Sequence, residues 1–386
     1  MADTAVYIHF PFCLTKCHYC SFNSVAGQEE LIPPYLEALH RELGQTGKAF
    51  FKAKDRALTV YFGGGTPSLM GPGRLQQLLG QVAQHLLLDD KSEVSLEANP
   101  GPGAHWRQFR QAGVNRMSLG LQSFSDEFLK VLGRAHTREQ GIMAYNEIRG
   151  AGFESVGVDL IFGLPGQSLQ QWERDLKSVL KLSPDHISVY GLSVEEGTLF
   201  YKLKQEKRLS LPDEYLEAEM FSLAHDLLVA AGYEHYEISN YARPGHRCRH
   251  NRIYWQRGQY LGLGVGAHSF LPEAASYGIR MANEPDIGKY IASVVAQGAG
   301  LKDKEILNRE EAICEVMFLS LRTSEGLALL EFENRFGPKL RERLLKGSRS
   351  MVAEGKLFHE EGRLKFSLEG MLLADELTVT LLKSLF

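Results

Sequence analysis

The sequence has few cysteines and no long apolar run. Its 386 residues include five cysteines, a small and odd number that does not suit a framework of disulfides. No apolar stretch approaches the roughly 20 residues that a membrane-spanning helix needs. The first ten residues do not form the basic segment and apolar segment of a secretion signal. These absences predict a cytoplasmic protein in a reducing compartment.

The chain also lacks a marked excess of either charge. Lys and Arg total 43, Asp and Glu total 47, and the formal net charge is -4. This balance gives no general attraction to the phosphates of nucleic acid. One basic run, at 340–349, lies in an otherwise acidic chain, so we expect no nucleic-acid partner.

Six short segments rich in β-branched and aromatic residues alternate with helical patterns in the first half of the chain. They are 6–10, 58–62, 94–98, 116–121, 156–162 and 186–192. Repeated strand–helix units predict a parallel sheet, and six units are fewer than the eight of a closed barrel. We therefore expect an α/β fold, a partial (β/α)6 barrel with functional residues at the carboxyl ends of its strands.

The character of the sequence changes after about residue 270. We expect the barrel over residues 1–280, a linker over 281–300 and a small C-terminal domain over 301–386. In this last part, helical patterns precede two alternating runs around Glu-Glu-Gly at 360–362, which predict a hairpin. The C-terminal domain is therefore predicted to be α+β and winged-helix-like.

Three of the five cysteines follow the first predicted strand. Cys13, Cys17 and Cys20 have the spacing C-x3-C-x2-C, which lets one loop bring three thiolates to one metal centre. A structural zinc site needs four protein ligands, whereas three thiolates on a four-iron cluster leave one iron open to another ligand. We predict a [4Fe-4S] cluster. The alternatives are a zinc site that also uses His18, and three unconnected core cysteines.

This cysteine motif and the segments beyond it resemble the radical S-adenosylmethionine (SAM) enzymes, in particular their coproporphyrinogen-oxidase-like branch. The segments that carry the resemblance are 7–13 (YIHFPFC), 63–68 (GGGTPS), 96–101 (LEANPG), 112–124 (AGVNRMSLGLQSF), 132–137 (LGRAHT) and 159–168 (DLIFGLPGQS). The resemblance covers most of the chain. The resemblance implies that SAM chelates the open iron, that a partner donates one electron, and that cleavage yields a 5'-deoxyadenosyl radical.

The same resemblance implies a set of SAM contacts at or beside the strand ends. Glycines let a backbone approach a ligand closely, carboxylates accept hydrogen bonds from an ammonium or a ribose, and an arginine can fork onto a carboxylate. Taken one at a time, these residues would equally suit tight turns, salt bridges or aromatic packing. The implied contacts are Tyr7, Tyr19, Gly64, Gly65, Thr66, Glu97, Gln122, Arg134 and Asp159.

Two features depart from the oxidases of this branch. The oxidases carry a further cysteine two residues after the third, where this chain has Phe22. The chain also contains HNRIYW at 250–255, which resembles the H-N-x-x-Y-W motif of heme chaperones related to the oxidases. Both features favour the chaperones.

The motif at 250–255 offers groups that suit heme. His250 has an imidazole that can ligate iron, and Tyr254 and Trp255 have aromatic faces that can cover a porphyrin. Cys248 and His268 are further candidate ligands. The alternative is that the first two residues of the motif satisfy backbone groups while its aromatics pack in the barrel.

The resemblance therefore predicts a heme chaperone that carries a [4Fe-4S] cluster with exchangeable SAM. Its expected partners are heme, an electron donor and heme acceptors such as respiratory-chain hemoproteins. A homodimer and a peripheral association with the membrane are further expectations. The alternative function is that of an oxygen-independent coproporphyrinogen III oxidase, although we expect the chain to lack that turnover.

Overall fold

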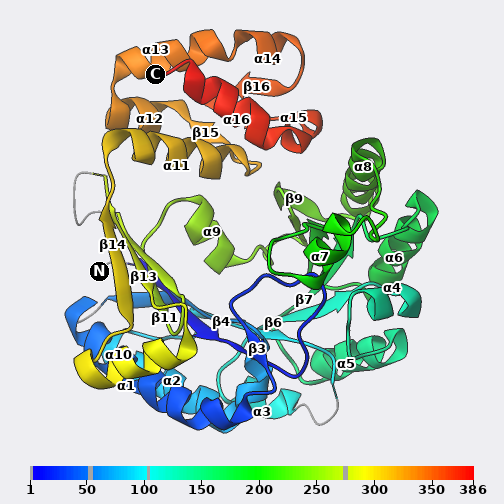
Figure 1. Ribbon diagram of the computed structural model, residues 1–386. Helices are drawn as coiled ribbons and strands as arrows, with labels where there is room; N and C mark the ends of the chain where they lie inside the picture. Colours follow the sequence, from blue (N-terminus) through cyan, green and yellow to red (C-terminus); the bar gives the residue numbers. More distant parts are fainter. Residues whose placement is uncertain (1–2, 51–54, 102–104, 273–276) are drawn as a thin grey trace.

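A twelve-stranded sheet forms the centre of the computed structural model, which describes residues 3–50, 55–101, 105–272 and 277–386 (Figure 1). In spatial order the strands are β14 (Leu301–Ile306), β13 (Ile279–Asn283), β12 (His268–Leu271), β11 (Tyr260–Leu263), β1 (Asp3–Phe10), β4 (Arg56–Gly64), β5 (Glu93–Ala98), β6 (Arg116–Gln122), β7 (Ser155–Phe162), β8 (His186–Gly191), β10 (Asn240–Ala242) and β9 (Glu234–Glu237). The seven strands from β11 to β8 run parallel, and those outside them are antiparallel. The edge strands β14 and β9 lie at opposite ends of this order, so the barrel is open.

The six predicted strand–helix units are confirmed as β1, β4, β5, β6, β7 and β8, in chain order. Their apolar side chains are buried against helices that cover the outer face of the sheet (Figure 1). These helices are α1 (Ile32–Phe50), α2 (Pro72–His85), α3 (Trp106–Gln111), α5 (Arg138–Gly150), α6 (Leu169–Leu182) and α8 (Glu214–Ala230). Thr137 and Ser168 begin α5 and α6 with capping boxes, which fixes where these two helices begin.

Residues 281–300, where the sequence predicts a linker, hold the end of β13 and helix α10 (Ile287–Gln297). Helix α10 packs on α1, and β14 then extends the sheet with six exposed residues. The polar residues in this stretch belong to regular structure rather than to a linker. Asp286 caps α10, and charged side chains protect the edge strand β14. The sheet therefore continues to residue 306.

The C-terminal unit consists of helices and a small antiparallel sheet in the order β15-β17-β16, as the winged-helix-like prediction requires. Its elements are α11 (Arg309–Leu321), β15 (Leu327–Ala328), α12 (Leu329–Phe336), α13 (Pro338–Gly347), α14 (Arg349–Ala353), β16 (Leu357–Glu360), β17 (Arg363–Phe366), α15 (Leu368–Leu372) and α16 (Ala374–Lys383). The predicted hairpin turns at Glu361 and Gly362, whose positive φ values of 49° and 73° suit a type I′ turn.

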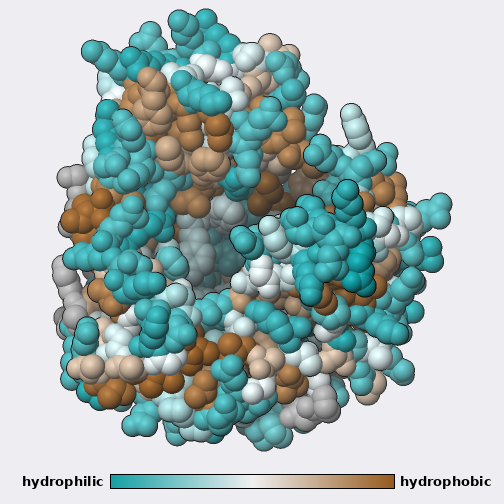
Figure 2. Space-filling view, viewed as in Figure 1, coloured by the Kyte–Doolittle hydropathy of each residue, from teal (hydrophilic) through white to brown (hydrophobic). Residues whose placement is uncertain are grey.

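Helix α9 (Arg249–Trp255) lies between the sheet and the C-terminal unit (Figure 1). It contacts β4 on one side and α11 on the other. Figure 2 shows this face of the molecule hollowed near its middle, below the C-terminal unit. None of the helices in the four described ranges has both the length and the apolarity needed to cross a membrane.

Candidate cofactor site

The three clustered cysteines lie in the loop that joins β1 to α1. Short strands β2 (Phe12–Cys13) and β3 (Val25–Ala26) pair with each other and hold the ends of this loop. Lys16 Nζ closes the loop by donating to the carbonyl oxygen of Phe22 at 2.7 Å. The thiols of Cys13, Cys17 and Cys20 are free, partly exposed and line one cavity.

The zinc alternative fails on its fourth ligand. The Nδ1 of His18 is engaged elsewhere, 2.8 Å from the carbonyl oxygen of Val131, and the ring lies beside Phe200. Among the residues that the structure describes, no three His, Cys, Asp or Glu side chains converge closely enough to hold one metal ion. A four-iron cluster needs its thiolates farther apart, because each binds a different iron. The donor set therefore fits the cluster better than a zinc ion.

The cysteines line a cavity of about 420 Å³ at the carboxyl ends of β4, β5, β6 and β7. A volume of this order is typical of small-molecule sites. The residues predicted to bind the cluster or SAM that line it are Cys13, Cys17, Tyr19, Cys20, Gly64, Gly65, Glu97, Gln122, Arg134 and Asp159. Segments more than a hundred residues apart thus meet in one cavity, as their positions at strand ends predict.

Thr66 and Tyr7, the other two implied SAM contacts, lie beside this cavity. Thr66 is buried, and its Oγ1 lies 3.6 Å from Cys13 Sγ. Tyr7 lines a second cavity of about 400 Å³, which shares Gly64, Glu97 and Phe22 with the first. The two cavities are therefore neighbours, and Phe22 stands at their common wall.

Glycines at the cluster loop are required by close packing. A Cβ at Gly65 would lie 2.7 Å from the carbonyl oxygen of Phe12 and 3.0 Å from Cys13 Sγ. Gly64 has a positive φ of 117°, and a Cβ there would contact the ring of His9. The GGG segment therefore brings backbone directly against the cysteine loop.

Two partly buried carboxylates form part of the cavity wall. Glu97 accepts hydrogen bonds from Tyr61 Oη at 2.8 Å and from the Gly64 N–H at 3.1 Å. Asp159 accepts from Ser118 Oγ at 3.0 Å. Burial raises the pKa of Glu97 to about 7 and also raises the pKa of Asp159. Both groups would be stabilised by a ligand that brings an ammonium or hydroxyl donors.

Arg134 reaches from the loop after α4 (Asp126–Val131) to the cysteines. Its Nη1 lies 3.4 Å from Cys17 Sγ, and its Nη2 donates to Asn99 Oδ1. Its Nε is buried and has no hydrogen-bond partner among the described residues. Such an unpartnered donor is suited to a ligand carboxylate.

Asn99 also belongs to the site, although it is not among the residues predicted from the sequence. Its Nδ2 donates to Thr66 Oγ1 at 2.9 Å, and its Oδ1 accepts from Arg134. It thus connects the arginine to the hydroxyl that contacts Cys13. The available signal was its place in the LEANPG segment, two residues after Glu97.

Gln122 is held in a strained conformation at the end of β6. Its φ is 68°, which only glycine adopts readily, and the pairing of β6 with β7 shifts register at this point. The bulge brings the side chain of Gln122 beside Gly120, where an added Cβ would lie 2.7 Å from Gln122 Nε2. Strain of this kind at a cavity is a feature of functional sites.

His250 lies in the interior, and its surroundings do not support the prediction that it ligates heme iron. Nδ1 is 2.7 Å from Thr59 Oγ1 and Nε2 is 2.8 Å from Tyr254 Oη. The ring also stacks on Tyr61, with centroids 4.9 Å apart. Burial lowers the pKa of His250 to about 3. Both ring nitrogens are therefore engaged, with side chains rather than with the backbone groups of the alternative interpretation.

The other candidate heme residues face different spaces. Tyr254 lines the second cavity together with His268, which is exposed. Trp255 lines a third cavity, of about 390 Å³, between the barrel and the C-terminal unit. Cys248 is buried, with Sγ 3.8 Å from Glu93 Oε1. The structure therefore does not bring these residues together in one site.

Comparison with protein-family models matches residues 7–179 to the Radical SAM superfamily and residues 307–373 to the HemN C-terminal domain. Coproporphyrinogen III oxidase (HemN) from Escherichia coli has the same fold, with a TM-score of 0.84, 22% identity and coverage of 98% of this chain and 90% of its own.

Curated relatives extend over nearly the whole chain. The heme chaperone HemW of Bacillus subtilis is 35% identical over 96% of this chain and 97% of its own. The mitochondrial Radical S-adenosyl methionine domain-containing protein 1 of Danio rerio is 34% identical over 99% of this chain and 88% of its own. The chain therefore belongs to the radical SAM superfamily and, within it, to the HemW family.

Proposed function

We propose that this protein is a heme chaperone, which binds heme and passes it to acceptor proteins. The observation that carries the proposal is the match, end to end, with the Bacillus subtilis protein named heme chaperone HemW. Phe22 supports it, because an exposed phenylalanine stands where the related oxidases have a further cysteine.

In the proposed protein, Cys13, Cys17 and Cys20 hold a [4Fe-4S] cluster that leaves one iron open. When bound, the cluster and SAM would supply one-electron chemistry at the rim of the barrel. The free thiols, the glycine backbone at Gly64 and Gly65, and the size of the cavity support this assignment.

The polar residues of the cavity match the charges of SAM. Arg134 has an unpartnered Nε to donate to a carboxylate, and Glu97 and Asp159 can accept from an ammonium or from ribose hydroxyls. Gln122 and Tyr19 line the same cavity, and Thr66 supports Cys13 from beside it. Tyr7 would act from the adjoining second cavity.

The alternative function is radical decarboxylation of coproporphyrinogen III. The chain shares the fold of the Escherichia coli oxidase, and the same cavity would serve that reaction. At 22% identity, however, this likeness establishes the fold alone. We therefore keep it as the second candidate.

The proposed function also suggests the partners and the location of the protein. We propose an electron donor for the cluster and respiratory-chain hemoproteins as acceptors, with a homodimer and a peripheral association with the membrane as further expectations. All five cysteines are free thiols, which supports a location in the reducing cytoplasm.

A Cys17→Ser variant tests whether heme and the cluster have separate sites. We expect loss of the cluster, measured as bound iron and sulfide, together with retained heme uptake in a spectroscopic titration. Cys314→Ser, on α11 and away from the cavity, is the matched control and should keep both. Loss of heme uptake together with the cluster in Cys17→Ser alone would contradict separate sites.

A further inference from the structure

The cavity between the barrel and the C-terminal unit is rich in arginine. Its volume is about 390 Å³, and it is bounded by the end of α9, by α11 and α12 and by β15. None of its lining residues lines the cofactor cavity or the second cavity. Its charged lining residues are Arg247, Arg252, Arg257, Arg335, Arg363, Glu325 and Glu331. Positive charge is in excess, so the cavity suits an anion.

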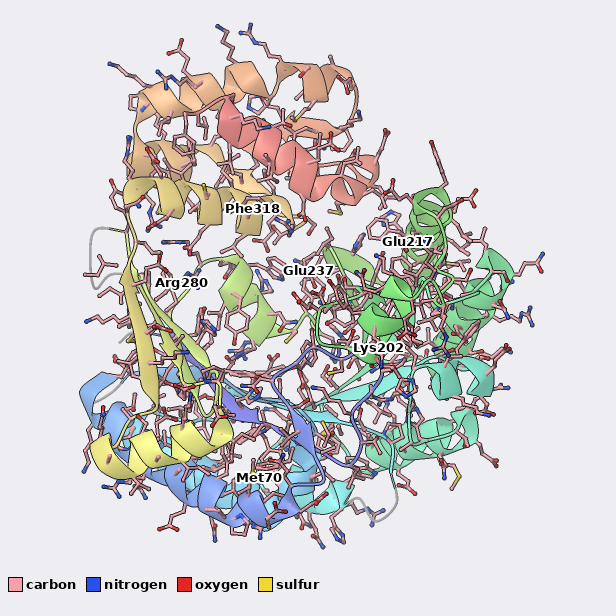
Figure 3. All side chains as sticks on the ribbon, in the orientation of Figure 1. Met70, Lys202, Glu217, Glu237, Arg280 and Phe318 are labelled. Carbon is pink, nitrogen blue, oxygen red and sulfur yellow. The ribbon has the colours of Figure 1, made fainter. Side chains whose placement is uncertain are left out.

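Two of these arginines join the two parts of the chain, and a third, Arg363, binds within the C-terminal unit. Arg252 pairs with Glu325 at 2.8 Å, and Arg247 lies 3.6 Å from the same carboxylate. Arg363 Nη1 donates to the carbonyl oxygen of Glu325 at 3.2 Å. Arg280, on the barrel side, also holds the junction by pairing with Glu315 of α11. Figure 3 labels Arg280 and, on α11, Phe318.

The other two arginines have donor capacity left over. Arg257 is only 7% exposed, and its Nε pairs with Glu315 at 2.7 Å while its Nη2 donates to the carbonyl oxygen of Tyr277. Its Nη1 is buried and finds no partner within the described ranges. A buried guanidinium nitrogen without an acceptor is costly, which points to a missing anionic partner.

Arg335 is exposed on α12 and forms no ion pair with any described carboxylate, although Glu331 lines the same cavity. Its guanidinium lies over the ring of Phe336, 5.6 Å from the centroid. Because Arg335 also lines the cavity, this contact keeps the guanidinium at the rim of the cavity, where it is still exposed to solvent. A second donor is therefore positioned beside Arg257.

Aromatic side chains line the cavity next to these donors. Trp255 comes from the end of α9 and is partly exposed, whereas Phe332 and Phe336 of α12 are buried and pack on each other, with ring centroids 5.0 Å apart. Aromatic faces favour flat ring systems, and arginine forks favour carboxylates. The combination suits a planar aromatic molecule that carries carboxylates at one edge.

We propose that this cavity binds the carboxylate edge of heme, with the propionates at Arg257 and Arg335 and the macrocycle against Trp255. The proposal rests on the proposed function and deepens it, because it gives heme a site apart from the cluster and SAM. It also explains why the HNRIYW motif ends in Trp255 while His250 is enclosed. The competing interpretation is that the arginines only join the barrel to the C-terminal unit.

The test is a heme titration of Arg335→Glu, because Arg335 has no ion pair whose loss would disturb folding. We expect heme to bind about tenfold more weakly or worse, since the variant places a carboxylate against the propionates. Arg349→Glu, an exposed position on α14 outside the cavity, makes the same charge change and should bind heme like the wild type. SAM binding should be unchanged in both variants.

The dimethyl ester of heme serves as the second probe, because it lacks the carboxylates. The difference between Arg335→Glu and wild type should disappear with this ester. If the wild type binds heme and Arg335→Glu binds it equally well, the site is wrong and the chaperone function stands. If both probes weaken equally, the propionate contact is wrong. If the wild type binds no heme at all, the proposed function itself fails.

Discussion

Single residues at the cofactor cavity have donor or acceptor groups that remain available to a ligand. Arg134 Nε has no partner among the described residues, and partial burial raises the pKa of Glu97 to about 7. Both would gain from a ligand with a carboxylate and an ammonium on one carbon, which is the methionine end of SAM. The groups best suited to bind a ligand are therefore those that lack a hydrogen-bond partner or an opposite charge within the protein.

Asn99→Ala should weaken SAM binding by about tenfold, equivalent to about 1.4 kcal/mol. The variant removes the side chain that holds Arg134 Nη2 and Thr66 Oγ1 in place. Isothermal titration of the reconstituted protein with SAM measures the effect, and Asn334→Ala, at an exposed position of α12, is the control. Unchanged affinity in Asn99→Ala would show that Asn99 does not position the arginine for the ligand.

The affinity for SAM should rise by about tenfold between about pH 6 and about pH 8. Because the pKa of Glu97 is raised to about 7, the carboxyl is mostly protonated at the lower pH and mostly ionised at the higher. Only the ionised form attracts an ammonium, so binding strengthens as pH rises through this range.

Two variants identify the titrating group in this pH dependence. Glu97→Gln should remove most of it, whereas Glu195→Gln, at an exposed position of the same cavity, should retain it. Equilibrium dialysis at both pH values provides the measurement. A slope that survives in Glu97→Gln would assign the titration to another group.

At the scale of elements, the sequence predicts regular structure better than it predicts contacts. The six parallel strands are evident because buried parallel strands have apolar, β-branched runs that end in glycine or polar residues. Helix α10 and strand β14 are missed, because the residues between 281 and 306 are rich in polar side chains that cap a helix or protect a sheet edge.

Prediction of the candidate site succeeds for residues placed by regular structure and fails for residues placed by tertiary contacts. Residues next to strand ends converge as predicted, because parallel strands bring their carboxyl ends to one edge. Asn99 is missed, and the motif at 250–255 is not one surface, because a seven-residue helix turns His250 toward Thr59 and Trp255 toward the C-terminal unit. Such orientations depend on tertiary packing that no spacing reveals.

Glu42→Ala should destabilise the fold by about 3 kcal/mol, because it leaves buried donors without an acceptor. Glu42 on α1 accepts hydrogen bonds from Tyr290 Oη at 2.7 Å, from Asn283 Nδ2 at 2.7 Å and from the Gly264 N–H at 2.8 Å. It thus ties α1 to the added edge of the sheet. Urea unfolding followed by circular dichroism measures the loss.

Glu37→Ala, on the exposed face of the same helix, is the control for this variant and should change stability by less than about 0.5 kcal/mol. Equal effects of the two substitutions would mean that helix propensity, not the buried network, is being measured.

At the scale of the whole molecule, separate cavities are available for SAM and for heme. The cofactor cavity and the second cavity share Phe22, Gly64 and Glu97 at the rim of the barrel, whereas the arginine-lined cavity lies at the junction with the C-terminal unit. Helix α9 contacts both the sheet and α11, so it connects these regions. This arrangement allows heme and SAM to be held at once.

The central claim is that the chain carries heme rather than oxidising a porphyrinogen. The most direct test is an anaerobic assay of the reconstituted protein with coproporphyrinogen III, SAM and a reductant, run beside a heme titration of the same preparation. We expect stoichiometric heme uptake and no catalytic formation of protoporphyrinogen. Protoporphyrinogen formed at a catalytic rate would contradict the chaperone account and identify the chain as an oxidase.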